Sequence, residues 1–165
     1  MADNGKFDYL LLTMDFHKYD KYLNIFFRDI TALGSFVFHL FLLLFIVALG
    51  KNDLFGQLLF SLFFTLIVTV IVRIFYFKDR PQKQDFENIF EKIDASSFPS
   101  LHTARTVAMV LILLDYMQNN AVTIFLMGFS ALVIYSRVYL RKHDWEDVAG
   151  GIILGVVTFF LALLV

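Results

Sequence analysis

The sequence predicts an all-α bundle embedded in a membrane. Of its 165 residues, 59% are hydrophobic and 18% are charged, and the mean hydropathy is +0.70, unlike an ordinary soluble domain. Several apolar segments are long enough to cross about 30 Å of hydrocarbon, where the backbone must satisfy its own hydrogen bonds within helices. We expect one domain over residues 1–165. The net charge of -1 does not suggest a nucleic-acid partner, and the lack of cysteine excludes thiolate chemistry.

Five apolar segments are predicted to cross the membrane, and they occupy residues 31–49, 54–77, 99–117, 121–139 and 147–165. The connections at 50–53 and 118–120 are short, so they join antiparallel neighbours on one face of the bundle. The N-terminal segment, the 78–98 loop and the turn at 141–146 then share the opposite face.

The N-terminal segment, residues 1–30, has the pattern of an amphipathic helix lying at the membrane surface. Tyr22, Phe26 and Ile30 recur at helical spacing, and charged residues occupy the other side. We expect this helix to pack against the rim of the bundle.

The 78–98 loop repeats the amphipathic pattern with Phe86, Phe90 and Ile93. This spacing predicts a short lid helix on the face that carries the loop. The same pattern also fits a helix that rests on lipid without a gating role.

Gly151 and Gly155 form a pair of small residues one helical turn apart in the last span. Such a pair favours close helix packing within the chain, although a dimer contact has the same signature. The oligomeric state therefore stays open.

Five basic or titratable residues lie at the ends of the predicted spans, on the face of the bundle that carries the 78–98 loop: Arg73, Arg80, His102, Arg137 and His143. An arginine that moves to the bilayer centre costs about 2.5 to 3.5 kcal/mol, so such a cluster marks a functional site. Arg73 and Arg80 are seven residues apart. A helix that continues to Pro81 would therefore project both guanidiniums from one face.

The third span opens with Pro99-Ser100-Leu101-His102. Ser100 is suited to cap the helix, and the free N–H groups and dipole of a helix N-terminus favour an anion. A phosphate group is the expected anion.

Arg137 ends the fourth span, and His143 precedes Asp147 by four residues. One helical turn brings such a pair together, so the carboxylate can hold one imidazole nitrogen. This pair has the pattern of an oriented nucleophile.

Three arginines, a helix N-terminus and two histidines fit phosphoryl transfer, because the charge on the transferring oxygens needs preorganised donors. One histidine must be neutral to attack phosphorus, and another must be protonated to release the alkoxide. His143 with Asp147 fits the attack, and His102 fits the acid.

Basic residues at membrane boundaries are also common as simple anchors that reach the headgroups. For Lys78, Lys83, Arg141 and Lys142 the anchor role is the preferred interpretation.

Three motifs stand in order along the chain: Arg73-x6-Arg80-Pro81, Pro99-Ser100-Leu101-His102 and Ser136-Arg137-x5-His143-x3-Asp147. Together they resemble the signature of the type 2 phosphatidic acid phosphatase (PAP2) superfamily, K-x6-R-P, P-S-G-H and S-R-x5-H-x3-D. The resemblance covers the chain from about Arg73 to its end, and a looser likeness covers the stretch from Leu23 to Ser35.

The resemblance implies a phosphatase that needs no metal and no cofactor. In such an enzyme His143 forms a phosphohistidine, His102 protonates the leaving group and Asp147 orients His143. The phosphate-binding residues would be Arg73, Arg80, Ser100, Leu101 and Arg137.

The chain departs from the family pattern at two positions. Arg73 stands where the family has lysine, so a planar fork replaces a point charge beside the phosphate. Leu101 stands where the family has glycine, which allows closer backbone approach. Leu101 could therefore narrow the pocket or weaken catalysis.

A site at the membrane surface is most easily reached by a lipid whose tails stay in the bilayer while its phosphate enters the site. The expected substrates are a polyprenyl diphosphate, phosphatidate, phosphatidylglycerophosphate or a lipid A-type phosphate, with the polyprenyl carrier or a glycerophospholipid phosphate preferred. Two alternatives stay open, a lipid phosphotransferase with the same phosphoenzyme and a noncatalytic lipid-phosphate-binding protein.

The expected location is the cell membrane, as a multi-pass protein. Of the 14 Lys and Arg residues, only Lys51 lies on the face opposite the predicted site, which favours a cytoplasmic site. The family resemblance implies an outer or luminal site instead. The side of the membrane is left open by this conflict.

Overall fold

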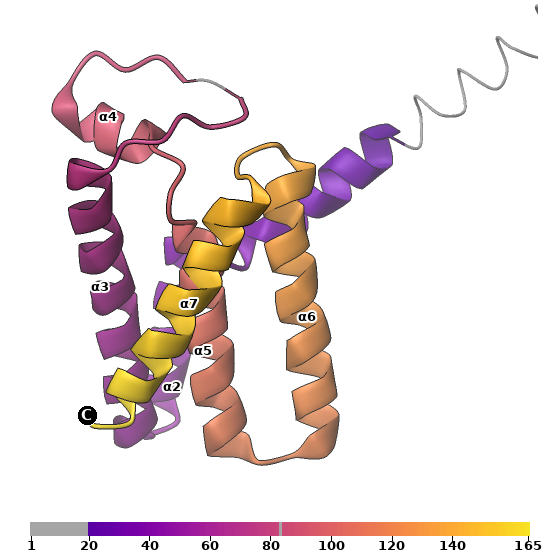
Figure 1. Ribbon diagram of the computed structural model, residues 1–165. Coiled ribbons are helices and arrows are strands. Elements are labelled where there is room, and N and C mark those ends of the chain that lie inside the picture. Colours follow the sequence, from indigo (N-terminus) through magenta and orange to yellow (C-terminus); the bar gives the residue numbers. More distant parts are fainter. Residues whose placement is uncertain (1–19, 83) are drawn as a thin grey trace, which may run out of the picture.

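The computed structural model describes residues 20–82 and 84–165, and every regular element in this part of the chain is a helix (Figure 1). The helices are Asp20–Ala32, α2 (Phe36–Ala48), α3 (Asn52–Phe75), α4 (Ile89–Ala95), α5 (Leu101–Met117), α6 (Asn120–Tyr139) and α7 (Trp145–Ala162). The predicted all-α membrane fold is confirmed. The start of the predicted surface helix, up to residue 19, lies outside the described residues.

Fewer of the described helices have the length of a membrane span than the sequence predicted. Among the described residues, α3, α6 and α7 are each long and apolar enough to cross a membrane. The Asp20–Ala32 helix and α2 make a fourth candidate if this pair, bent by 47°, forms one span. The other two predicted spans are shorter than expected, because α2 has 13 residues and α5 has 17. The count of five spans therefore stays a prediction.

The bend before α2 has a local cause in the sequence. Gly34 interrupts the apolar run, and the Ser35 hydroxyl then caps α2 by accepting the Phe38 N–H at 3.2 Å. A Cβ atom at Gly34 would lie 2.7 Å from the Thr106 hydroxyl on α5, so only glycine fits at this crossing. The predicted 31–49 span is divided here.

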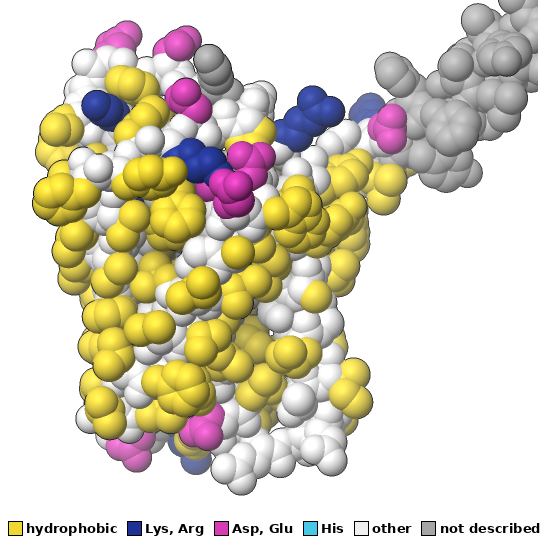
Figure 2. Space-filling model, viewed as in Figure 1, with side chains coloured by type: hydrophobic (Ala, Val, Ile, Leu, Met, Phe, Trp, Pro, Cys, Tyr) yellow, Lys and Arg dark blue, Asp and Glu magenta, His cyan; other side chains and the backbone are white. Residues whose placement is uncertain are grey.

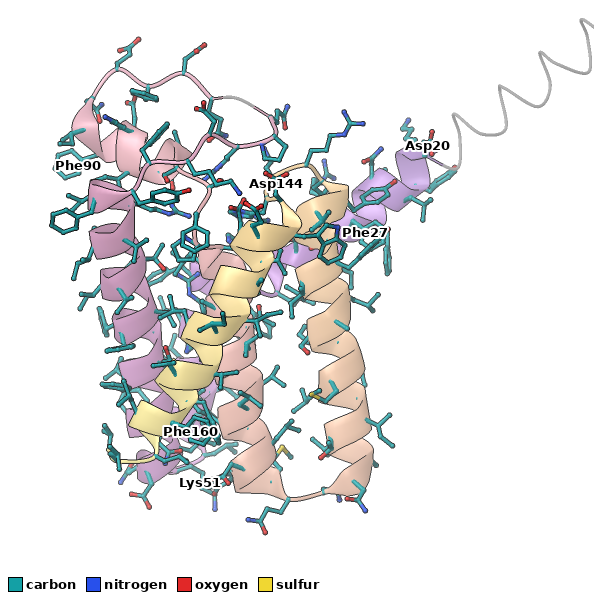
Figure 3. All side chains as sticks on the ribbon, in the orientation of Figure 1. Asp20, Phe27, Lys51, Phe90, Asp144 and Phe160 are labelled. Carbon is teal, nitrogen blue, oxygen red and sulfur yellow. The ribbon has the colours of Figure 1, made fainter. Side chains whose placement is uncertain are left out.

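The two predicted amphipathic helices are present beside the bundle. The Asp20–Ala32 helix packs on the rim through Phe27, whose ring lies 4.4 Å from that of Tyr139. The short helix α4 lies next to the end of α3 (Figure 1). On α4, Ile89 is 67% exposed and Phe90 is 81% exposed, and Figure 3 shows Phe90 projecting outward from the bundle. Helix α4 therefore presents apolar side chains outward, whereas the Asp20–Ala32 helix uses Phe27 to pack against the bundle.

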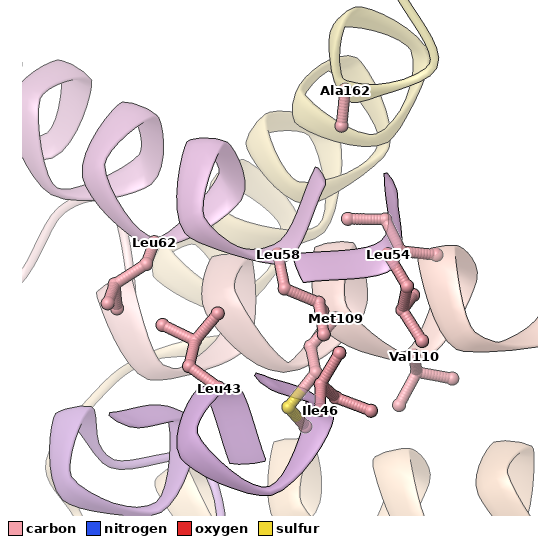
Figure 4. Packing of buried hydrophobic residues seen from close by; sticks show 9 residues of the cluster. Leu43, Ile46, Leu54, Leu58, Leu62, Met109, Val110 and Ala162 are labelled. Atoms are coloured by element: carbon pink, nitrogen blue, oxygen red, sulfur yellow. The ribbon is translucent and has the colours of Figure 1, made fainter. Parts of the chain in front are cut away.

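The apolar core occupies the half of the bundle away from α4. Helix α5 is central and packs on α3, α6 and α7. Buried residues from four helices meet in this core (Figure 4), namely Leu43, Ile46, Leu54, Leu58, Leu62, Met109, Val110, Ile112 and Ala162. His39 also packs beside this core, and its Nε2 lies 3.1 Å from the Leu58 carbonyl oxygen.

The surface separates into an apolar belt and two charged ends. Figure 2 shows hydrophobic side chains over the middle of the visible face, with most Lys, Arg, Asp and Glu at the end that carries α4. Such a belt suits contact with the hydrocarbon of a bilayer, and charged groups outside it remain solvated. The candidate site lies at the charged end.

Two glycines allow α7 to approach α5 closely. A Cβ at Gly151 would lie 2.6 Å from the Ser100 carbonyl oxygen, and one at Gly155 would lie 2.7 Å from the Ala104 carbonyl oxygen. Val107 is equally close to Gly155. The small-residue pair therefore serves packing within the chain, as one of the two sequence interpretations expected.

We expect Gly155→Ala to destabilise the bundle by about 1 to 3 kcal/mol, because the added methyl group overpacks the α5–α7 contact. Thermal unfolding in detergent measures the loss. Gly128→Ala on α6 is the matched control, since a Cβ there meets nothing within 4 Å. That control should be neutral or gain up to about 1 kcal/mol of helix propensity. Equal unfolding temperatures for the two variants would contradict the close contact.

Candidate active site

The first motif is divided between a helix and an extended segment. Arg73 lies in the last turn of α3 and is buried. The helix ends at Phe75, and Tyr76 already has extended backbone angles, φ -133° and ψ 99°. Arg80 therefore does not share a helical face with Arg73, and the expectation of a helix continuing to Pro81 is wrong.

Tertiary hydrogen bonds explain why the helix stops early. The Lys78 N–H donates to the Ser96 hydroxyl at 3.3 Å, and the Ser97 N–H donates to the Lys78 carbonyl at 2.8 Å. The Ser97 hydroxyl also donates to the Asp79 carbonyl at 3.1 Å. The segment after α3 is held against the segment before α5, and this turns Arg80 back toward the site.

The second motif forms the N-terminus of α5. Ser100 is the N-cap residue, as predicted, but its hydroxyl accepts the Thr103 hydroxyl at 3.0 Å instead of capping a backbone N–H. The Ser100 N–H donates to the Asp147 carbonyl at 3.0 Å, so the start of α5 is tied to α7. Leu101 and His102 form the first turn of the helix.

The third motif connects α6 to α7. Arg137 lies in the last turn of α6, and its carbonyl accepts the His143 N–H at 3.2 Å across the turn. Asp144 then caps α7, and its backbone N–H donates to the Asp147 carboxylate at 3.0 Å. Figure 3 shows Asp144 at the end of the bundle that carries α4, with Lys51 at the opposite end. The turn thus delivers His143 to the same end as the other motifs.

His143 and Asp147 form a buried pair. The imidazole Nδ1 lies 3.5 Å from the Asp147 Oδ2, and both side chains are almost fully buried. The geometry leaves Nε2 of His143 as the nitrogen available to the cavity, where His143 is a lining residue.

The motifs meet around a cavity of about 210 Å³, which is lined by Arg73, Arg80, Asp94, Leu101, His102, Arg137 and His143. Of the site residues predicted from sequence, Ser100 and Asp147 do not line this cavity. Ser100 is adjacent to Leu101 in the chain. Asp147 lies next to the Nδ1 atom of His143 and not on the cavity wall.

Arg73 and Arg137 are held in place by backbone and hydroxyl oxygens. Arg73 donates to the carbonyls of Ile93 and Pro99, both at 3.2 Å. Arg137 donates to the Thr31 hydroxyl at 2.9 Å. None of these acceptors carries a charge, so the positive charge of the guanidiniums is not neutralised by ion pairing there.

Arg80 is fixed by its own loop. It donates to the Gln84 side chain at 2.8 Å and to the backbone carbonyl of Asp94. Among the described residues, the Nε atoms of Arg73, Arg80 and Arg137 are buried without a hydrogen-bond partner. Arginines that line a small cavity and keep buried donors without partners favour an anion with several oxygen atoms.

The surroundings favour a neutral His143. Burial lowers the pKa of His143 below its ordinary value, and the charges of Arg137 and Arg80 lower it further, although Asp147 acts in the opposite direction. A neutral imidazole has a free lone pair and can attack phosphorus.

Lys78 does not play the anchor role that its position suggested. Its ammonium lies 2.9 Å from Asp147 and 3.0 Å from Glu146. Burial opposes the charged form of Lys78, but these two carboxylates outweigh it and raise its pKa above the ordinary value. Lys83, another predicted anchor, lies outside the described residues.

Sequence reasoning missed two further residues near the site. Asp94, at the end of α4, lines the cavity, and nothing in the amphipathic pattern distinguishes it from other polar residues of that helix. Arg105 on α5 is 4% exposed, and its closest acceptor is the Gly34 carbonyl at 3.5 Å. Arg105 had a signal, because an arginine inside a predicted span is costly and usually functional.

Comparisons with known proteins identify the family and the fold of the chain. Residues 54–165 match the family described as the PAP2 superfamily. The fold is similar to the crystal structure of LpxE from Aquifex aeolicus, with a TM-score of 0.72 and 23% identity over 87% of this chain and 86% of that one. It is also similar to a transmembrane PAP2-type phosphatidylglycerolphosphate phosphatase from Bacillus subtilis, with a TM-score of 0.66 and 27% identity over 86% of this chain and 75% of that one. No curated protein matches the chain.

The family match covers more than half of the chain and includes all three motifs. The cavity joins these motifs at the charged end of a membrane bundle. The chain therefore belongs to the PAP2 superfamily, and it is a phosphatase.

Proposed function

We propose that this protein hydrolyses a lipid phosphate or diphosphate through a phosphohistidine on His143. The observation that carries the proposal is the convergence of Arg73, Arg80 and Arg137 with two histidines on one small cavity. The cavity lies at the membrane-surface end of the bundle, where a lipid can present its phosphate while its tails remain in the bilayer.

In the first step, Nε2 of His143 attacks phosphorus and the bond from phosphorus to the leaving oxygen breaks. Asp147 holds Nδ1 of His143 and stabilises the positive charge that develops on the ring. The three arginines and the N-terminus of α5 bind the phosphoryl oxygens, whose charge they meet with preorganised donors. The negative charge of the bound phosphate offsets the arginines beside His102, so this histidine takes up a proton in the complex and gives it to the leaving oxygen.

In the second step, water attacks the phosphohistidine and the nitrogen–phosphorus bond breaks. His102 accepts a proton from the attacking water, and inorganic phosphate then leaves the cavity lined by the three arginines. His143 returns to its neutral form. No step requires a metal ion or a cofactor, and we propose that the enzyme works without either.

Two observations support a lipid substrate. The exposed Ile89 and Phe90 of α4 stand beside the site and suit contact with lipid. The Bacillus subtilis neighbour is a phosphatidylglycerolphosphate phosphatase, which favours a glycerophospholipid phosphate among the candidates. Polyprenyl diphosphate and phosphatidate are the other candidate substrates, and the phosphate-release experiment below compares all three lipids.

The decisive experiment measures inorganic phosphate release by the purified protein from phosphatidylglycerophosphate, phosphatidate and polyprenyl diphosphate, with a chelator present. His143→Ala should lower release by a factor of about 10³ or more, because the nucleophile is lost. Lys142→Gln, at the neighbouring position, is the control and should retain activity. Equal release by wild type and His143→Ala would overturn the proposal, and release only with an added lipid acceptor would indicate a phosphotransferase.

Leu101→Gly should increase phosphate release from at least one lipid of this panel by up to about tenfold, which corresponds to about 1.4 kcal/mol of barrier. Leu101 lines the cavity, and its removal lets the phosphate approach the backbone of α5 more closely. The same change should lower the unfolding temperature slightly, since glycine costs a helix about 0.5 to 1 kcal/mol. No gain with any substrate would show that Leu101 does not restrict the site.

The acid limb of kcat/KM should lie below pH 6.5, the ordinary pKa of histidine. The pKa of His143 is lowered by its burial and by the neighbouring arginines. The reactive neutral form therefore predominates at neutral pH, and activity falls only when pH drops through the lowered pKa. A pH–rate profile measures this limb. If activity already falls above pH 6.5 as the pH is lowered, a neutral His143 as the nucleophile would be contradicted.

A further inference from the structure

Lys78 makes a shorter side-chain contact with Asp147 than His143 does, although Lys78 is not among the residues that line the cavity. Its Nζ lies 2.9 Å from Oδ1 of Asp147. Asp147 is fully buried, whereas the Lys78 side chain is 20% exposed. A buried carboxylate requires a partner for each oxygen, and Lys78 is the cation that supplies one of them.

The two oxygens of Asp147 have separate partners. Oδ1 accepts from Lys78, while Oδ2 accepts the Asp144 N–H at 3.0 Å and lies 3.5 Å from Nδ1 of His143. Lys78 on Oδ1 and the Asp144 N–H on Oδ2 together hold the carboxylate with Oδ2 as the oxygen nearer the imidazole.

The position of Lys78 is itself built into the fold. Hydrogen bonds from its backbone to Ser96 and Ser97 hold the segment after α3 against the start of α5. Arg80 follows two residues later in the same segment and lines the cavity. One short segment thus carries both Arg80, which lines the cavity, and Lys78, which contacts Asp147.

We propose that Lys78 is a positioning residue for the nucleophile. It orients Asp147 so that His143 keeps its proton on Nδ1 and presents Nε2 to the phosphate, and its charge offsets that of Asp147 so that His143 remains neutral. The inference rests on the proposed function in one respect, since it takes His143 as the nucleophile.

Other charged groups also surround His143, so the contribution of Lys78 must be separated from theirs. They come from each element around the site and include Arg73, Arg80, Asp94, His102, Arg137 and Asp147. Glu146 and Asp144 share the Lys78 ammonium, at 3.0 and 3.6 Å. A variant of Lys78 leaves all these groups in the chain, so a change in His143 titration can be assigned to the lysine.

The test compares Lys78→Met and Lys78→Arg with Lys92→Met. Lys92 is a matched control, because it is a lysine of the same loop region whose ammonium lies over the Phe77 ring at 5.6 Å and not against Asp147. NMR titration of protein labelled with ¹⁵N-histidine measures the tautomer and pKa of His143 directly and does not depend on activity. Phosphate release and inhibition by inorganic phosphate are measured on the same preparations.

For Lys78→Met we expect the pKa of His143 to rise by about one unit, because the negative charge of Asp147 beside the ring is then no longer offset by the lysine. The Nδ1–H tautomer should become mixed. We also expect kcat to fall about tenfold, the acid limb to move to higher pH, and inhibition by inorganic phosphate to stay unchanged, since Lys78 does not line the cavity. Lys78→Arg should restore most of kcat, and Lys92→Met should resemble wild type.

Three results would overturn the inference. The first is an unchanged tautomer and pKa of His143 in Lys78→Met. The second is loss of inhibition by inorganic phosphate in that variant, which would mean that Lys78 only supports the loop that carries Arg80. The third is an equal effect of Lys92→Met. Failure of the proposed function looks different, because the wild type would then release no phosphate while His143 still responded to Lys78→Met in the NMR titration.

Discussion

The close contact between α5 and α7 is the constraint on which the rest of the site depends. Gly151 lets the two helices approach until a Cβ there would lie 2.6 Å from the Ser100 carbonyl. At this crossing the Ser100 N–H reaches the Asp147 carbonyl at 3.0 Å. The N-terminus of α5, which suits an anion, is thereby placed beside the His143–Asp147 pair. A larger residue at the crossing would separate the phosphate-binding group from the nucleophile.

The second requirement is an excess of positive charge that the bundle does not neutralise internally. Arg73 and Arg137 are held mainly by uncharged oxygens, and the carboxylate of Asp147 is shared by Lys78 and His143. Among the described residues that line the cavity with the three arginines, Asp94 is the one acidic residue, and buried cations in excess of their counter-charges reduce stability, because each loses its hydration. A phosphate group supplies the missing charge, so the same arrangement that costs folding energy favours substrate binding.

Sequence reasoning predicted the site residues better than it predicted how the chain brings them together. The spacing of Arg73 and Arg80 indicated one helix, yet the helix ends at Phe75 and the second arginine returns through an extended segment. Lys78 was interpreted as a headgroup anchor, and it contacts Asp147 instead. Both differences come from contacts between residues about 20 to 70 positions apart in the chain, such as those of Lys78 with Ser96 and with Asp147. Local periodicity carries no information about such contacts.

The sequence by itself determined the membrane environment, the helical class and the chemistry of the site. Hydropathy decides the first two, because lipid leaves a spanning backbone few alternatives, and the three motifs supply groups that suit only a few reactions. Only the tertiary structure decided that Asp94 lines the cavity, that Arg105 is buried near the Gly34 carbonyl, and that Lys78 contacts Asp147. Those facts depend on which helix ends meet, and that is set by the packing of α3, α5 and α7 as a whole.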